Sequence, residues 1–372
     1  MRRGLQNTSL ELEERLVDKA NEALVPLTVN LELTPLCNFN CDMCFIRMDK
    51  ASVNRYGGVR GKDEWLDLAR QFKQMGTLFV LLSGGEPMLH PDFEAIYQGL
   101  KQMGFILTVN TNGSLIDERA IALFREYTPR RVNVTLYGTS AETYDRLCHQ
   151  ADGYNRTMRG LRLLKEAGID TKINVSVVEK NKGDYERILQ TAQELGMPVE
   201  VNAYMSPCAR TECAETRQID RERLTPEEAA QADITYFKHR FGDGYRAFVE
   251  ERLERVHHGP YTPEGQGLDC RAGRSSAWIN WRQILTPCVA METPRYDLKQ
   301  MPCAEAWQKL TADCRRLPSH QECAGCQLRA ICNVCYEEAI EEKTKYGKLN
   351  YLCDMSRHKL KVMEKDLTTD PK

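Results

Sequence analysis

The chain has 372 residues, 42% of them hydrophobic, and a formal net charge of −2. This length predicts two or three domains with a large core, and the balanced, mixed charge excludes a strongly basic surface for a nucleic acid or a membrane. No apolar run reaches the ~18–20 residues of a membrane span, and the first 30 residues lack a signal-peptide pattern, so we expect a cytoplasmic protein.

The chain contains 15 cysteines, which is unusual for a protein of the cytosol. In a reducing compartment these cysteines are not expected to form structural disulfides. A cysteine-rich cytosolic chain is more often a metal-binding or redox protein.

Strand and helix patterns alternate along the first two thirds of the chain, after a charged helix expected at 10–23. Glycine follows several of the helices as a stop signal. Such alternation predicts an α/β fold with a parallel sheet, and six repeats favour a partial β/α TIM-like barrel with its ligand site at the carboxyl ends of the strands. The expected strands are 28–33, 77–82, 105–110, 131–136, 171–178 and 198–204, and the expected helices are 63–74, 92–103, 117–127, 154–167 and 184–195.

Composition divides the chain into four predicted segments. We expect an N-terminal helical segment at 1–30, the partial barrel at 31–216, a charged helical bridge at 217–262 and a cysteine-rich domain at 263–372. The last segment has little regular periodicity, which favours a small domain organised by bound metal.

Three cysteines lie within eight residues directly after the first strand: Cys37, Cys41 and Cys44. Three close thiolates can bind three irons of a cubane cluster and leave the fourth iron open to a cofactor or substrate. The alternatives are a zinc site and buried structural cysteines; a structural zinc site usually needs four ligands, and no neighbouring His or Cys supplies the fourth.

The Cys-x3-Cys-x2-Cys spacing resembles the signature of the radical S-adenosylmethionine (SAM) superfamily. The resemblance implies a [4Fe–4S] cluster whose open iron binds the methionine part of SAM, and whose electron splits the cofactor into methionine and a 5′-deoxyadenosyl radical. It implies that Met43 packs near the adenine, and it assigns Phe45 to cofactor binding as well.

Further motifs in order along the chain strengthen the resemblance. Gly84, Gly85, Glu86 and Pro87 match a family motif that binds the methionine amino group, although Gly-Gly-x-Pro is also a common turn. Family members carry polar residues facing the cofactor at the ends of the next two strands. The corresponding residues are Thr111, Asn112 and Thr135.

The chain departs from the family pattern after the fourth strand. Tyr137 replaces an acidic residue, and Cys148, rather than Arg146, falls at the position of an arginine near the cofactor carboxylate. Arg146 is therefore interpreted as a surface residue, and no catalytic acid or base is assigned.

Seven cysteines of the C-terminal region resemble the SPASM domain, an extension that binds auxiliary iron–sulfur clusters. The resemblance assigns Cys323, Cys326, Cys332 and Cys353 to an outer [4Fe–4S] cluster, and Cys270, Cys288 and Cys335 to an inner one with an unidentified fourth ligand. A single cluster and a zinc ribbon are the alternatives. The family spacing differs at Gln283, where a glycine is usual, and between Cys332 and Cys335. The remaining cysteines are interpreted as small buried hydrophobic residues; they are Cys148, Cys208, Cys213, Cys303 and Cys314. For Cys208 and Cys213, which follow the last barrel strand near the expected substrate mouth, a functional role is the alternative.

The resemblance implies that an external flavodoxin or ferredoxin reduces the enzyme, and that the substrate is a peptide or protein. Modification could be side-chain oxidation, a thioether or carbon–carbon crosslink, or epimerisation. Only about 30 residues precede the first strand, so we expect any leader peptide to bind either a separate partner protein or the surface of the barrel. The alternatives are a small-molecule dehydrogenase or epimerase and a non-catalytic electron carrier; no nucleic acid or membrane partner is expected.

Overall fold

The structure is a computed structural model that describes residues 3–207, 219–258, 268, 270–318, 322–323, 325–332 and 335–369, with side chains from residue 12 onward. Cys208 and Cys213, and the segment boundaries expected at 216/217 and 262/263, lie outside these residues.

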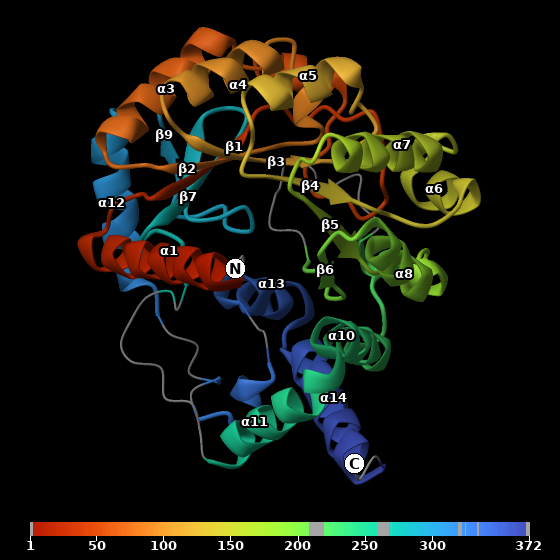
Figure 1. Ribbon diagram of the computed structural model, residues 1–372. Helices are drawn as coiled ribbons and strands as arrows, with labels where there is room; N and C mark the ends of the chain where they lie inside the picture. The colour runs from red at the N-terminus through yellow and green to blue at the C-terminus, as the bar shows by residue number, and fades with distance from the viewer. Residues whose placement is uncertain are drawn as a thin grey trace.

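One sheet runs through the described part of the chain, in the strand order β6-β5-β4-β3-β2-β1-β7-β8-β9 (Figure 1). The first six strands are parallel, and β7 continues the parallel arrangement on the other side of β1. This is the predicted α/β partial barrel. The six barrel strands are β1 (Thr28–Glu32), β2 (Phe79–Ser83), β3 (Ile106–Thr111), β4 (Arg131–Thr135), β5 (Thr171–Ser176) and β6 (Val199–Asn202).

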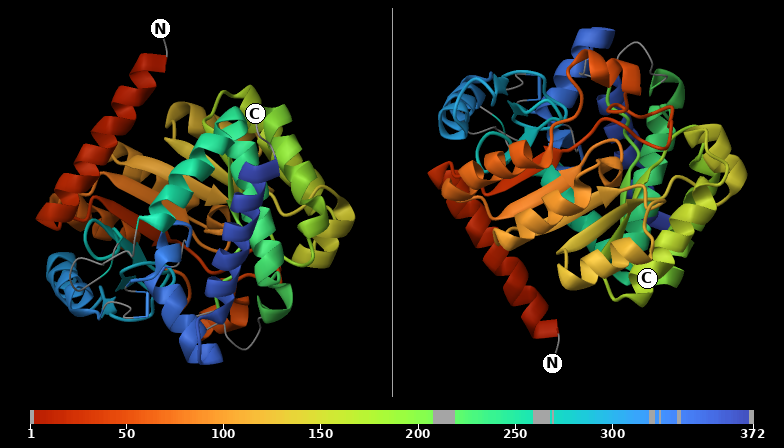
Figure 2. Two further views of the ribbon diagram at one scale, coloured as in Figure 1. Left: turned by 90° about the horizontal axis from the view of Figure 1, so that it is seen from below. Right: turned by 90° about the horizontal axis from the view of Figure 1, so that it is seen from above.

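Helices cover the outer face of these strands (Figures 1 and 2). The five predicted helices are confirmed within two residues at each end. Their amphipathic periodicity made them recognisable in the sequence. A capping residue also marks the start of the third, where the Asp117 side chain accepts a hydrogen bond from the Ala120 amide. The pattern missed two short helices, α2 (Lys50–Arg55) and α6 (Ala141–Cys148). The five helices are α3 (Lys62–Gln74), α4 (Phe93–Gln102), α5 (Glu118–Glu126), α7 (Gly153–Glu166) and α8 (Tyr185–Leu195).

The cysteine-rich region begins as an extension of the barrel sheet. Strand β7 (Ser276–Ile279) pairs with β1, and β8 (Ile284–Thr286) and β9 (Tyr296–Asp297) follow as antiparallel strands. The buried Glu32 carboxylate of β1 accepts from the Trp278 indole of β7 at 3.0 Å. The sequence pattern did not predict these short strands, which continue the barrel sheet into the cysteine-rich region.

Three helices follow in the C-terminal region, and the last of them packs on the bridge. Helices α12 (Cys303–Arg316), α13 (Tyr336–Tyr346) and α14 (Asn350–Thr369) follow the hairpin, and α14 lies along α10 (Pro226–Phe241) (Figure 1). A buried ion pair joins Lys359 of α14 to Asp233 of α10 at 3.0 Å. The helical bridge, completed by α9 (Ile219–Glu222) and α11 (Tyr245–His257), therefore shares a core with the C-terminal region.

Helix α1 (Arg3–Ala23) lies outside the sheet, and its N-terminal end projects from the body (Figure 2). The Trp307 indole of α12 donates to the carbonyl oxygen of Leu24 at 2.7 Å, which fixes the other end. No helix in the described residues combines the length and apolar character needed to cross a membrane.

Candidate functional site

The three N-terminal cysteines lie in one loop at the carboxyl end of β1. All three are half-buried. The amide of Phe39 donates to Cys37 Sγ at 3.4 Å, and the amide of Arg47 donates to Cys44 Sγ at 3.3 Å. Two of the three sulfurs therefore accept backbone N–H hydrogen bonds, although burial raises the pKa of Cys37 to about 12.

The glycines at the end of β2 hold this cysteine loop in place. The Gly85 amide donates to the Thr34 carbonyl oxygen at 2.8 Å, and the Glu86 amide donates to the Leu36 carbonyl oxygen at 2.8 Å. A Cβ at Gly85 would lie 2.8 Å from the Pro35 oxygen and nearer still to that of Leu36. The close backbone approach predicted for these glycines is therefore an approach to the cysteine loop, and it aligns Glu86 with the loop.

Glu86 is fully buried between two strand ends. Both carboxylate oxygens accept from the Thr111 hydroxyl at 2.9 Å, and the amides of Asn112 and Met88 donate at 2.8 and 3.2 Å. Burial raises the pKa of Glu86 to about 7, although the Asn112 amide and the Thr111 hydroxyl oppose the rise. A cation placed against this carboxylate would favour the ionised form.

Asn112 connects Glu86 to the cysteine loop. Its side-chain amide donates to Asn38 Oδ1 at 2.9 Å and approaches Cys37 Sγ at 3.7 Å. Sequence reasoning missed Asn38, which also donates to the Ser114 hydroxyl at 2.8 Å. The predicted residues Cys37, Glu86, Thr111 and Asn112 thus form one connected group.

The other predicted cofactor residues surround the same strand ends. Thr135 is half-buried at the end of β4, Met43 is buried in the core beside the cysteines, and Phe45 is 38% exposed. Pro87 is buried at the start of a single helical turn, Pro87–Leu89. Their positions at one edge of the sheet agree with the prediction that the site lies beyond the carboxyl ends of the strands.

Two residues that depart from the family pattern contact Cys41. The Cys148 thiol and the Tyr137 hydroxyl both hydrogen-bond to its sulfur. The contact with Cys148, followed by burial, raises the pKa of Cys41 well above its usual range. The Asn40 amide donates to the Cys148 carbonyl oxygen at 2.9 Å, so the end of α6 supports the cysteine loop.

A charged network also fixes the loop, through Asp42. This carboxylate accepts from Lys180 and from His149 Nε2, the latter at 2.7 Å, and Lys180 reaches Glu222 of α9 at 3.1 Å. Burial acts to raise the pKa of Asp42, but the hydrogen bonds from Lys180 and His149 outweigh it and lower the pKa.

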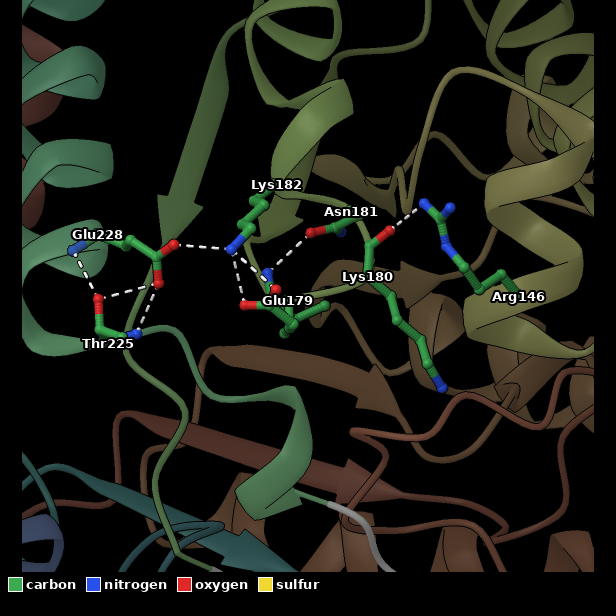
Figure 3. Close-up of polar contacts among 8 residues, drawn as sticks. Arg146, Glu179, Lys180, Asn181, Lys182, Thr225 and Glu228 are labelled. Carbon is green, nitrogen blue, oxygen red and sulfur yellow. Dashed lines mark hydrogen bonds and ion pairs between the residues drawn. The ribbon is translucent and has the colours of Figure 1, made fainter.

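Figure 3 shows the segment that carries Lys180. Arg146 donates to the Lys180 carbonyl oxygen, which is consistent with its interpretation as an exposed residue. Lys182 pairs with Glu228 at 2.7 Å, and Glu228 in turn accepts from Thr225 at 2.9 Å, so α10 is joined to the same segment (Figure 3).

Comparison with known proteins decides the family. Residues 31–192 match the family described as the radical SAM superfamily, and they include the cysteine loop, Glu86 and Asn112. The chain therefore contains a radical SAM domain. As a radical SAM enzyme it is expected to bind SAM and a [4Fe–4S] cluster, and three half-buried thiols beside a buried carboxylate fit both groups.

This radical SAM enzyme resembles a curated protein and two solved structures over most of its length. An AdoMet-dependent heme synthase of Methanosarcina barkeri is 24% identical over 326 residues, which cover 84% of this chain and 92% of the relative. Among solved structures, anSMEcpe with bound AdoMet has a TM-score of 0.67 at 17% identity, covering 92% of this chain and 98% of the other. SuiB of Streptococcus suis bound to the precursor peptide SuiA has a TM-score of 0.64 at 17% identity, covering 91% and 78%. At these identities the two structures show a shared fold.

A second group of cysteines lies near the C-terminal end of the sequence, almost three hundred residues after the radical SAM motif. The four residues assigned to the outer cluster, Cys323, Cys326, Cys332 and Cys353, line one cavity of about 290 Å³. Burial raises the pKa of Cys323, and the neighbouring Cys332 raises it further. In the described part of the chain no three ligand-type side chains are arranged around a single metal ion.

The three cysteines assigned to the inner cluster also lie near one another. Burial raises the pKa of Cys288 to about 12, and the charges of Cys335 and Cys270 contribute to the rise. Cys270 and Cys335 are exposed, while Cys288 is half-buried at the end of the β8 segment. The three come from a loop, a hairpin and the start of α13, so only the fold could bring them together.

Proposed function

We propose that this radical SAM enzyme is of the SPASM type and abstracts hydrogen from a peptide or protein substrate. The observation that carries the proposal is the grouping of ten cysteines into three sets, one in the barrel and two in the C-terminal region. In this proposal residues 31–216 are the radical domain, residues 217–262 the bridge, and residues 263–372 the domain of two auxiliary [4Fe–4S] clusters.

Each residue group of the barrel has a distinct part in the proposed chemistry. Cys37, Cys41 and Cys44 would bind the first cluster. When bound and reduced, this cluster supplies the electron that splits SAM into methionine and a 5′-deoxyadenosyl radical. The carboxylate of Glu86 would accept hydrogen bonds from the methionine ammonium group, which would replace some of its present donors. A cation at this position stabilises the ionised form of a buried carboxylate. Gly84 and Gly85 set the distance between Glu86 and the cysteine loop.

The remaining predicted residues would hold the nucleoside part of SAM. Thr135, Asn112 and Thr111 offer polar groups at successive strand ends, and Met43, Phe45 and Pro87 offer apolar surface. Packing around the site keeps water and oxygen from the radical, which prevents side reactions.

A peptide or protein substrate is supported by the shared fold with anSMEcpe and SuiB, which extends over nearly the whole chain. SuiB was solved with its precursor peptide. By this analogy the product would be an oxidised, crosslinked or epimerised side chain. We further propose flavodoxin or ferredoxin as the reductant, a separate protein for any leader peptide, and a cytoplasmic location.

A small-molecule substrate is the second candidate, and a specific observation favours it. The relative named AdoMet-dependent heme synthase aligns with most of this chain and nearly all of its own. A heme precursor is therefore the small molecule to test first, with a sugar or antibiotic intermediate as a further possibility.

The first experiment separates an enzyme from an electron carrier. The full chain is incubated without oxygen with SAM and dithionite, and 5′-deoxyadenosine and methionine are measured. We expect both products, their loss to background in Cys41→Ala, and their retention in Cys303→Ala, which removes a buried cysteine outside all three sets. Failure of the unmodified protein to cleave SAM would favour the electron carrier.

The second experiment identifies the substrate class. Peptides encoded beside the gene and a tetrapyrrole heme precursor are each supplied in deuterated form. Transfer of deuterium into 5′-deoxyadenosine marks the molecule from which hydrogen is taken, and a mass change in that molecule gives the reaction. Deuterium transfer from the tetrapyrrole alone would contradict the peptide proposal.

A further inference from the structure

Cys314 is a buried cysteine that the sequence analysis interpreted as packing, yet it lies beside the inner cysteines. It occupies the last turn of α12 and is 2% exposed. A Cβ at Gly273 would lie 2.9 Å from Cys314 Cβ and closer still to its sulfur. Gly273 follows Cys270 by three residues in the same turn, so the sulfur of Cys314 packs against the loop that carries an inner ligand.

The loop is shaped to admit this sulfur. Gly273 has a φ of +66°, and its amide donates to the Ser276 carbonyl oxygen at 2.9 Å. The Arg271 carbonyl oxygen accepts from the amides of Ser275 and Ser276 at 3.0 Å, which tightens the turn. Since glycine carries no side chain, it leaves the space that the thiol fills.

Helix α12 is also fixed to the hairpin that leads from Cys288. The Tyr296 hydroxyl of β9 donates to the carboxylate of Asp313, the residue before Cys314. The charges of both Cys270 and Cys288 act on the Cys314 thiol. The thiol is thus positioned from two sides, by the loop after Cys270 and by the hairpin after Cys288.

The other cysteine of the same helix has different surroundings. Cys303 stands eleven residues earlier, about three turns or roughly 16 Å along the helix. Its amide donates to Gln71 Oε1 at 3.1 Å, and the charge of Asp67, on the outer helix α3, acts on its thiol. Cys148 contacts Cys41 of the barrel. Among the described cysteines outside the three sets, Cys314 is the one that lies near Cys270 and Cys288.

We propose that Cys314 is the fourth thiolate of the inner auxiliary cluster. The inference rests on the proposed function, because it needs an inner cluster held by Cys270, Cys288 and Cys335. On binding iron the thiol releases its proton to solvent and forms an iron–sulfur bond, with no change in oxidation state. Four thiolates leave no open iron, so this cluster would pass electrons and would not bind the substrate directly.

The burial of Cys314 is consistent with a thiol that is neutral in the metal-free protein. Cys314 is 2% exposed, so a neutral thiol leaves no charge in the core before metal is bound. Iron then replaces the proton, as zinc does at structural thiolate sites.

The test uses the full chain with Cys37, Cys41 and Cys44 all changed to Ala, so that only auxiliary clusters remain. Iron, sulfide and zinc are counted after anaerobic purification, and the clusters are examined by electron paramagnetic resonance (EPR). We expect about eight irons for two four-iron clusters. Adding Cys314→Ala should lower the count by about one to four irons and change the EPR signal, whereas adding Cys303→Ala should change neither.

A small thiol provides a second readout. 2-Mercaptoethanol should shift the EPR signal of the Cys314→Ala protein, because a freed iron can bind it, and should leave the parent unchanged. Cys314→Ser nearly preserves the side-chain volume; if the alanine variant fails to fold, the serine variant is expected to show an altered EPR signal.

The outcomes separate the inference from the proposed function. A parent protein with eight irons, together with an alanine or serine variant that keeps all eight and the parent signal, overturns the role of Cys314 alone. A parent that holds only four irons, or zinc, overturns the inner cluster and the role of Cys314 together.

Discussion

The barrel and the C-terminal cysteine region are stabilised in different ways. In the barrel, alternate residues of each central strand are fully buried, as Leu107 and Val109 of β3 are, and the helices cover them. In the cysteine region from 322 to 353, few apolar residues are buried, Ile331 and Leu352 among them, and the loops are organised around a thiol-lined cavity. We therefore expect the barrel to fold on its apolar core alone, and the cysteine region to depend on the clusters proposed for it.

Metal removal should give the largest difference between the barrel and the cysteine region. We expect an anaerobic chelator to open the segments at 322–332 and 335 and to leave β1–β5 protected, because each bound cluster contributes several kcal/mol to local folding. Hydrogen exchange of the full chain with and without chelator measures this. Equal loss of protection in both regions would show that they do not differ in metal dependence.

The buried ion pair between the bridge and the C-terminal region should give the next largest effect. Glu342 of α13 is 1% exposed and accepts from Arg223 and from the Tyr204 hydroxyl, the latter at 2.8 Å. The Arg223 guanidinium also lies 4.1 Å from the ring centroid of Tyr351. Glu342→Gln should lower the free energy of unfolding by about 3–5 kcal/mol, because it leaves a buried guanidinium without its counter-charge.

The matched control for this pair is Glu251→Gln on α11. Glu251 pairs with Arg255 at 2.6 Å, but both side chains are more than half exposed. We expect a change below about 1 kcal/mol in chemical denaturation. Similar values for the two variants would mean that the buried pair does not hold the regions together.

The close backbone contact of the barrel site should give a moderate effect. Gly85→Ala is expected to cost about 1–3 kcal/mol, because its methyl group would overlap backbone atoms of Pro35 and Leu36. Gly183→Ala, where nothing lies within 4 Å of the added carbon, is the control and should change thermal stability little. If Gly85→Ala left the thermal stability unchanged, close packing would not be the reason for glycine at this position.

The pH dependence of Glu86 should give the smallest effect. The pKa of this carboxyl is raised from 4.5 to about 7 in the folded state, so the folded metal-free protein binds the proton more tightly than the unfolded chain. The contribution of Glu86 to the free energy of unfolding is therefore largest below pH 4.5. It decreases as the pH rises toward 7 and is lost above that value. Between pH 6 and 8 the loss should be about 1.4 kcal/mol.

Glu86→Gln should remove this pH-dependent contribution, which denaturation curves at several pH values can measure. The same variant tests the proposed cofactor contact, since the loss of the negative charge should weaken SAM binding by about 1.5–3 kcal/mol. An unchanged pH profile together with unchanged SAM affinity would exclude Glu86 as the ammonium-binding group.

Much of the barrel could be predicted from sequence because its signals are local. Alternation within strands such as Ile106–Thr111, periodicity within helices and the short cysteine motif all depend on neighbouring residues. The order of the motifs along the chain then placed Cys37, Glu86 and Asn112 at one edge of the sheet, where the structure has them in one connected group.

The rest depended on residues far apart in the chain. The amino-acid sequence by itself determined the parallel partial barrel, the radical SAM cysteine loop and the presence of further cysteine sets, because these follow from short-range patterns. Only the tertiary structure decided that β7 pairs with β1, that Lys180 meets Asp42 and that Cys314 lies beside the loop of Cys270. Such pairings are set by packing of the whole core, which no local pattern records.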